Sequence, residues 1–179
     1  MKAINLILIL IFSIISLSGQ TKVVHFKKLQ EFLPASIGQE YKRSKPTGNT
    51  QSMMGVTTSV AEVTFTKSIE NQGEESLIEF EISITDVSFT PFMLMAFSML
   101  QDYESETEYG YEKGITINNK FKGKLEVTSG DDTKSVNLQL AVGERFLVSA
   151  SLNGSDDSNL VQKIISEMKL NELSELKAD

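Results

Sequence analysis

Residues 61–85 read AEVTFTKSIENQGEESLIEFEISIT, and apolar residues alternate with polar ones in both halves of this stretch. A period of two is typical of β-strands that bury one face and leave the other in water. Asn71, Gln72 and Gly73 interrupt the pattern with residues that favour turns. The stretch therefore predicts an antiparallel hairpin with one wet face. The inward-facing residues it predicts are Ala61, Val63, Phe65, Ile78, Phe80, Ile82 and Ile84.

The same alternation returns between residues 115 and 152 in four further runs. Asn118-Asn119 separates the first two runs, and Asn tolerates the positive φ that a tight type I′ turn requires. A polar turn over residues 129–132 separates the next two. Gly143-Glu144 precedes the last run and suits a type II′ turn. This half of the chain predicts an antiparallel meander.

Two segments have the period of a helix instead. Residues 26–33 place Phe26, Leu29 and Leu33 on one helical face, and Pro34 ends the segment. After Asn153-Gly154, Ser155 or Asp156 can cap a closing helix. The apolar stripe of that helix is predicted to contain Leu160, Val161, Ile164, Ile165 and Met168.

Between the first helix and the hairpin, residues 37–45 predict an edge strand and residues 46–55 a polar loop, with Gly48 and Gly55 as breakers. An antiparallel sheet with one wet face must cover its other face, and the helices are the available cover. The predicted fold class is therefore α+β. It is a single antiparallel sheet, hairpin plus meander, of about 6–7 strands flanked by two or three helices.

The first twenty residues predict a secretory signal peptide. Lys2 is followed by an apolar run from Ile4 to Leu17 and then by small residues, the order that a signal peptidase recognises. A retained membrane anchor is the alternative, but the run is shorter than the roughly 18 residues of a spanning helix. We expect a signal peptide over residues 1–20 and one domain over 21–179. The protein is then periplasmic or extracellular, and the absence of Cys excludes a lipid anchor on a cysteine thiol.

The net negative charge of the chain argues against anionic partners. Without the first twenty residues the chain carries 16 basic and 24 acidic residues, a net charge of −8. Such a chain repels phosphate backbones and anionic headgroups at long range, so nucleic acid is not an expected partner. We expect a protein partner in the cell envelope. Contact with a membrane surface stays open but integral insertion is not expected, and the sequence does not indicate an oligomeric state.

Several short pieces of the chain occur in a familiar order. They are Leu33-Pro34, the Gly-flanked loop before Ser59-Val60-Ala61, the strand ending at Asp86, Gly110-Tyr111-Glu112-Lys113, Gly143-Glu144-Arg145-Phe146-Leu147-Val148, and a closing helix that runs into Leu170 and Leu173. This order resembles a group of small, uncharacterised exported bacterial proteins of PsbP-like architecture. The resemblance implies an antiparallel sheet flanked by helices and a non-enzymatic accessory role, and it assigns no functional residue.

The residues that usually perform catalysis do not converge in this sequence. There is no Cys, and the single histidine, His25, precedes the first helix, where a solvated or capping role is expected. One imidazole and no thiolate cannot form a common zinc site. The Ser-x-x-Lys spacing at residues 166–169 falls late in the closing helix and is attributed to chance. We therefore expect no enzyme, no cofactor and no catalytic or metal-binding residue.

Two metal hypotheses remain as alternatives. Asp102, Glu104, Glu106 and Glu108 alternate in a predicted loop, and calcium prefers clustered oxygen ligands, but the loop lacks the order of an EF-hand. A solvated acidic loop is the favoured interpretation. The seven methionines suggest thioether ligands for copper, against which core filling is the usual role of Met.

Residues 91–100, PFMLMAFSML, are the most unusual segment after the leader. Pro suits the first turn of a helix, and the following residues favour a helix of about ten residues. Its sides are nearly all apolar, so it is either buried core or a contact surface. The residues predicted to contact a partner or a ligand are Phe92, Met93, Leu94, Phe97 and Leu100.

The function expected from these features is an exported non-enzymatic binding or accessory module. It acts through the apolar helix and the acidic segment beside it, as part of an envelope assembly. The alternative is a carrier of a small hydrophobic ligand or lipid held between the sheet and that helix.

Overall fold

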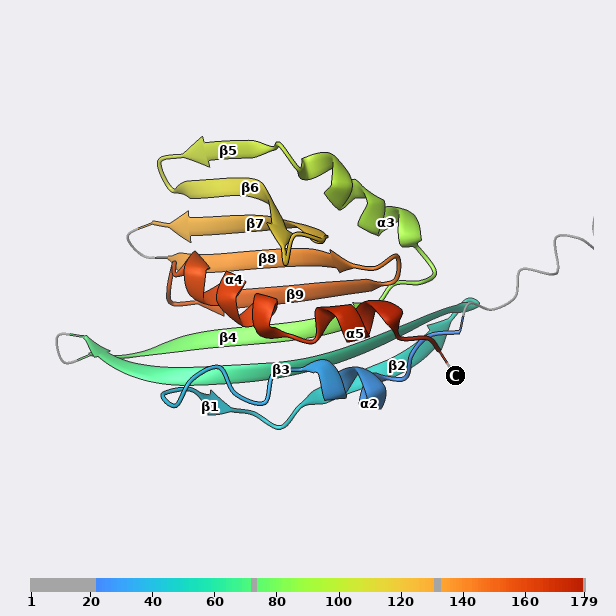
Figure 1. Cartoon of the computed structure of the whole chain (residues 1–179). Coiled ribbons are helices and arrows are strands. Elements are labelled where there is room, and N and C mark those ends of the chain that lie inside the picture. Colours follow the sequence, from blue (N-terminus) through green and yellow to red (C-terminus); the bar gives the residue numbers. More distant parts are fainter. Residues whose placement is uncertain (1–21, 72–73, 131–132, 179) are drawn as a thin grey trace, which may run out of the picture.

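The structure is a computed structural model that describes residues 22–71, 74–130 and 133–178 (Figure 1). Its main feature is one antiparallel sheet of nine strands in the order β1-β3-β4-β9-β8-β7-β6-β5, with β2 paired to β3 beside β1. The strands are β1 Lys42–Arg43, β2 Thr47–Met53, β3 Val56–Asn71, β4 Glu74–Asp86, β5 Glu104–Thr107, β6 Gly110–Ile117, β7 Phe121–Ser129, β8 Lys134–Val142 and β9 Phe146–Asn153.

The hairpin predicted from residues 61–85 is confirmed as β3 and β4. Val63 lies opposite Ile82 and Phe65 opposite Phe80, and all four side chains are buried. The residues between them along each strand, such as Glu81, point to the opposite, solvent-facing side. The alternation thus sets which face of the sheet becomes the core.

The meander is formed by β6 to β9. Asn118 and Asn119 have φ values of 52° and 56°, which confirms the left-handed turn expected there. Strand β9 pairs with β4 as well as with β8, for example Ala150 with Ile82. This pairing of segments distant in sequence joins the hairpin and the meander into one sheet.

The predicted sheet of 6–7 strands was wrong. Residues 46–55, predicted as a polar loop, contain strand β2, and the predicted edge strand over residues 37–45 is reduced to the two residues of β1. The acidic segment predicted as a loop contains strand β5. Strands β2 and β5 lie at the sheet edges and are largely exposed, so they carry no alternating apolar pattern. Periodicity reports burial and therefore misses such strands.

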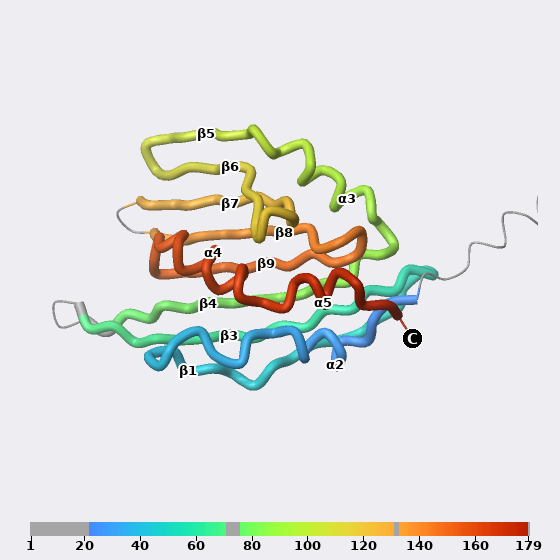
Figure 2. The backbone as a smooth tube through the Cα atoms, in the orientation of Figure 1, coloured from blue at the N-terminus to red at the C-terminus, as the bar shows by residue number. Residues whose placement is uncertain are grey.

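The helices also differ from the prediction of two or three helices flanking the sheet. The described α-helices are short: α2 Phe26–Leu29, α3 Pro91–Met95, α4 Ser158–Glu167 and α5 Leu170–Glu175. Helices α2, α4 and α5 lie over one face of the sheet, whereas α3 lies beyond the ends of β6 and β7 (Figures 1 and 2). The first helix continues as the 3-10 turn η1, Gln30–Phe32. The cap of α4 is Asp157, which accepts the Leu160 N–H at 3.0 Å, in place of Ser155 or Asp156.

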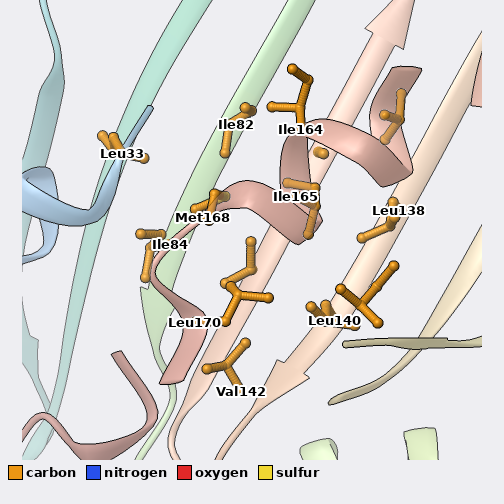
Figure 3. Close-up of a cluster of buried hydrophobic side chains, with 14 of the residues drawn as sticks. Leu33, Ile82, Ile84, Leu138, Leu140, Val142, Ile164, Ile165, Met168 and Leu170 are labelled. Atoms are coloured by element: carbon orange, nitrogen blue, oxygen red, sulfur yellow. The ribbon is translucent and has the colours of Figure 1, made fainter. Parts of the chain in front are cut away.

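The hydrophobic core fills the space between the sheet and helices α4 and α5. Ile164, Ile165 and Met168 point toward β4 and β8, where Ile82 and Leu138 are buried (Figure 3). Leu33 lies at one side of the same cluster, and Leu170 lies between Ile84 and Leu140 (Figure 3). The apolar stripe predicted for the closing helix therefore faces the sheet, as expected.

A buried ion pair lies where β4 ends. Asp86 is fully buried, and its Oδ2 accepts Arg145 Nε at 2.9 Å and lies 2.8 Å from Arg145 Nη2. The same carboxylate accepts the backbone N–H groups of Val24 at 2.7 Å and Ser88 at 3.1 Å. Arg145 Nη2 also donates to the Lys22 carbonyl. The pair thus fixes the first described residues against the ends of β4 and β9.

The signal peptide predicted for residues 1–20, and its expected cleavage point, lie outside the described residues. Within the described part of the chain, no helix has the length and apolarity needed to cross a membrane.

Candidate functional site

The apolar segment of residues 91–100 connects β4 to the distant edge strand β5. It forms α3 followed directly by the 3-10 helix η2, Ala96–Leu100. Pro91 stands in the first turn of α3, as predicted. A continuous ten-residue α-helix was predicted, whereas the second half is wound more tightly. The segment crosses the end of the sheet at β6 and β7 (Figure 1).

The two sides of α3–η2 differ sharply in exposure. Phe92 is 67% exposed, Met95 70% and Met99 85%, and Met93 is 47% exposed. Leu94 is only 5% exposed. These four exposed side chains are called the apolar face below.

The predicted contact residues therefore divide into two groups. Phe92 and Met93 lie on the apolar face, where a partner could reach them. Leu94 is buried, and Phe97 and Leu100 are half-buried, so these three lie on the packed side of the segment and not on the apolar face. Met95 and Met99 also lie on the apolar face and were not among the predicted contact residues. A helix that is apolar all round does not reveal which side its neighbours cover.

A glycine in β6 allows η2 to approach the sheet closely. The Gly114 N–H donates to the Tyr103 carbonyl at 2.8 Å. A Cβ atom at Gly114 would lie 1.6 Å from the Leu100 carbonyl oxygen, which no side chain tolerates. The position of α3–η2 thus depends on the absence of a side chain in the neighbouring strand.

More apolar side chains are exposed at the same end of the sheet. Asp86, at the end of β4, pairs with Ser59 near the start of β3, so the β2–β3 turn lies at the end from which α3 begins. In that turn, Met53 is 73% exposed and Met54 97%. Phe89, just before α3, is 37% exposed. Exposed apolar groups of this kind typically mark interaction sites.

An open groove of about 550 Å³ lies between α3–η2 and the ends of β7 and β8. Pro91, Leu94 and Met95 line it from the helix, and Phe121 and Ala141 line it from the strands. Its walls are thus largely apolar. Its volume falls within the roughly 300–1,000 Å³ usual for small-molecule sites.

Three charged residues also line the groove: Lys120, Lys122 and Glu144. Lys122 Nζ donates to the Thr116 hydroxyl at 3.1 Å, and Lys120 Nζ donates to the Asn171 side-chain oxygen at 3.0 Å. The Lys120 ammonium lies 4.9 Å from the Phe121 ring centroid. No pattern in the sequence indicated a role for these lysines. They follow the Asn118-Asn119 turn, and only the tertiary structure brings them beside α3.

The acidic segment that follows η2, residues 102–108, contains the edge strand β5. Asp102, Glu104, Glu106 and Glu108 are all exposed. Within the described ranges, no three His, Cys, Asp or Glu side chains gather closely enough to hold a metal ion. A side-chain hydrogen bond with Glu108 raises the pKa of Tyr109. Asp102 and Glu104 closely follow η2 and form a negatively charged border beside it, whereas Glu106 and Glu108 continue along β5 away from α3 (Figure 1).

The single histidine has a local role. His25 caps α2, and its Nδ1 accepts the Lys27 N–H at 3.3 Å. The capping role expected for it is confirmed.

The chain matches no protein-family model, no curated protein and no solved structure. The resemblance noted from the sequence has no support beyond the short pieces that suggested it.

Proposed function

We propose that this protein is an exported, non-enzymatic binding module that engages a protein partner through the apolar face of α3–η2. The observation that carries the proposal is the exposure of Phe92, Met93, Met95 and Met99 within eight consecutive residues. A large exposed apolar group gains free energy when a partner removes it from water. The leader sequence supports export, because its order of charged, apolar and small residues is that of a signal peptide.

The types of residue in the apolar face support a protein partner. Methionine side chains are flexible and polarisable, and aromatic rings and methionines are enriched in the cores of protein interfaces. A hydrophobic centre bordered by polar or charged groups is the usual layout of such an interface.

The acidic border narrows the class of partner. Asp102 and Glu104 closely follow η2 and are exposed. They favour a partner with an apolar pocket and a basic rim, and they repel anionic lipid headgroups. A protein partner therefore suits this surface better than an anionic membrane.

The partner can be identified by site-specific crosslinking in the host. A photo-crosslinking amino acid replaces Phe92 or Met99 in the full chain, and the crosslinked protein is identified by mass spectrometry. Gln139, which is exposed on the polar face of the sheet, carries the same group as a control. We expect one protein to crosslink at both helix positions and not at Gln139.

Affinity for that purified protein then tests the energetics. Phe92→Ser and Met99→Ser should each weaken binding by about 30-fold if these residues are hot spots, without lowering the melting temperature. Leu77→Ser removes an exposed apolar side chain near the start of β4, at the opposite end of that strand from α3, and should leave affinity unchanged. Added salt should weaken the complex because the acidic border is screened.

The outcomes that contradict the proposal are equally specific. Equal crosslinking at Gln139 would show nonspecific capture. Unchanged affinity in both Ser variants would exclude the apolar face from the interface. Cosedimentation of the protein with uncharged phosphatidylcholine vesicles, abolished by Phe92→Ser, would assign the apolar face to a lipid surface instead.

A further inference from the structure

We infer that the groove between α3–η2 and the ends of β7 and β8 binds a single-chain amphiphile with an anionic headgroup, such as a fatty-acid carboxylate. The site lies next to Leu94 and shares Met95 with the apolar face, and it is inferred from its own lining residues and not from the protein partner proposed above.

The walls of the groove suit an alkyl chain. Pro91, Leu94 and Met95 form one side, and Phe121 and Ala141 form the other. A strip of aliphatic and aromatic groups removes methylene groups from water without offering polar partners.

The charged groups beside the walls select the headgroup. Lys120 and Lys122 flank Phe121, and neither takes part in an ion pair among the described residues. Each ammonium donates to one neutral oxygen, whereas a lysine has three donors. Two cations against the single carboxylate of Glu144 leave the groove positive in a chain of net negative charge.

Lys124 provides the contrast within the same strand. Its ammonium lies 3.3 Å from the Glu112 carboxylate and 3.8 Å from Glu126, so its charge is already compensated. It does not line the groove. Lys122 in this strand and Lys120 just before it have no carboxylate partner within the described ranges and lie beside the apolar walls. Cations beside an apolar wall are the arrangement that binds an amphiphilic anion.

Titration of the purified protein with dodecanoate below its micelle threshold tests the inference. We expect saturable binding to one site, with dodecanol and dodecyltrimethylammonium at least about tenfold weaker because they offer the lysines no anion. Each methylene removed from the chain should weaken binding roughly fourfold. In NMR spectra the methyl signals of Leu94 and Ala141 should shift on titration.

Matched variants separate the headgroup site from the chain site. Lys122→Met should weaken dodecanoate binding about tenfold and remove the preference over dodecanol, whereas Lys124→Met should change neither. Ala141→Phe fills the groove and should abolish binding. Gln139→Phe, two residues away on the same face of β8, should leave binding intact.

Absence of saturable binding, or equal affinity for the acid, the alcohol and the ammonium compound, would overturn the inference. Equal loss of binding in Lys122→Met and Lys124→Met would show a diffuse charge effect and would also refute it. Melting temperatures of all four variants within a few degrees of the parent protein confirm that each result reports on the groove. The Phe92→Ser variant should bind dodecanoate normally, because Phe92 does not line the groove.

Discussion

Replacing Asp86 by Asn is expected to remove a large part of the stability of the domain. Asp86 is fully buried, and its carboxylate accepts two backbone N–H groups as well as the Arg145 guanidinium. Removing one partner of a buried ion pair costs about 3–5 kcal/mol, and the lower end applies because the Arg145 side chain is 22% exposed.

The amide also loses an acceptor. One oxygen of Asp86 faces Val24 and Arg145, and the other faces Ser88. Asn has one side-chain oxygen, so its NH₂ group takes the place of the other carboxylate oxygen. That NH₂ group then faces an N–H donor and cannot accept its hydrogen bond. One unsatisfied buried N–H costs about 1–3 kcal/mol. The total loss is about 4–6 kcal/mol, against the roughly 5–15 kcal/mol that stabilises a domain.

Urea and thermal unfolding followed by circular dichroism measure this loss. A decrease of about 4–6 kcal/mol corresponds to a melting temperature lower by roughly 8–24 °C for a domain of this size. Asp102→Asn, at an exposed carboxylate, is the control and should stay within about 0.5 kcal/mol of the parent. A loss below about 1 kcal/mol in Asp86→Asn would refute the reasoning, because the buried charge would then contribute little.

A double-mutant cycle isolates the pair itself. Arg145→Met should also destabilise the protein, and the double variant should lose clearly less than the two single losses combined. Additive losses would show that the two side chains act independently.

Three further predictions concern the sheet and the helix beside it. Ile82→Asp should unfold or severely destabilise the domain, because an unpaired carboxylate in the core costs several kcal/mol. Glu81→Thr, at an exposed position, should be nearly silent. Similar melting temperatures for the two variants would mean that the buried and exposed faces of β4 are reversed. Leu94→Ser should cost about 2–4 kcal/mol in thermal unfolding and Met95→Ser less than about 0.5, and equal losses would contradict their opposite exposures. Gly114→Ala should push the α3–η2 segment away from β6 and make it sensitive to limited proteolysis, with the rest of the sheet still protected; unchanged cleavage would show that the close approach has no structural role.

The central strands and the core could be predicted from the sequence, because the signal is local. In β4, Phe80, Ile82 and Ile84 alternate with polar residues, and the strand buries that one face. The apolar stripe of α4 and the left-handed Asn118-Asn119 turn are local in the same way. Each depends on the spacing or backbone preference of nearby residues.

Part of the candidate site was also predictable. The composition of residues 91–100 identified the segment and its start at Pro91. Which side of it is buried was not predictable, because apolar residues stand all around the helix axis and the choice belongs to the neighbouring strands. No sequence pattern indicated that Lys122 belongs to a site, because a single lysine in a strand is common. Only the fold places it beside an apolar groove.

By itself the sequence determined the inward and outward faces of the long strands, because alternate side chains of a strand point to opposite faces and the apolar ones become buried. Only the tertiary structure decided that β2 and β5 are strands, that β9 joins β4, and that α3–η2 lies across the ends of β6 and β7. The backbone N–H and C=O groups of paired strands such as β4 and β9 form hydrogen bonds with segments that are distant in sequence. Their partners are set by how the whole chain packs, and no local pattern of residues specifies them.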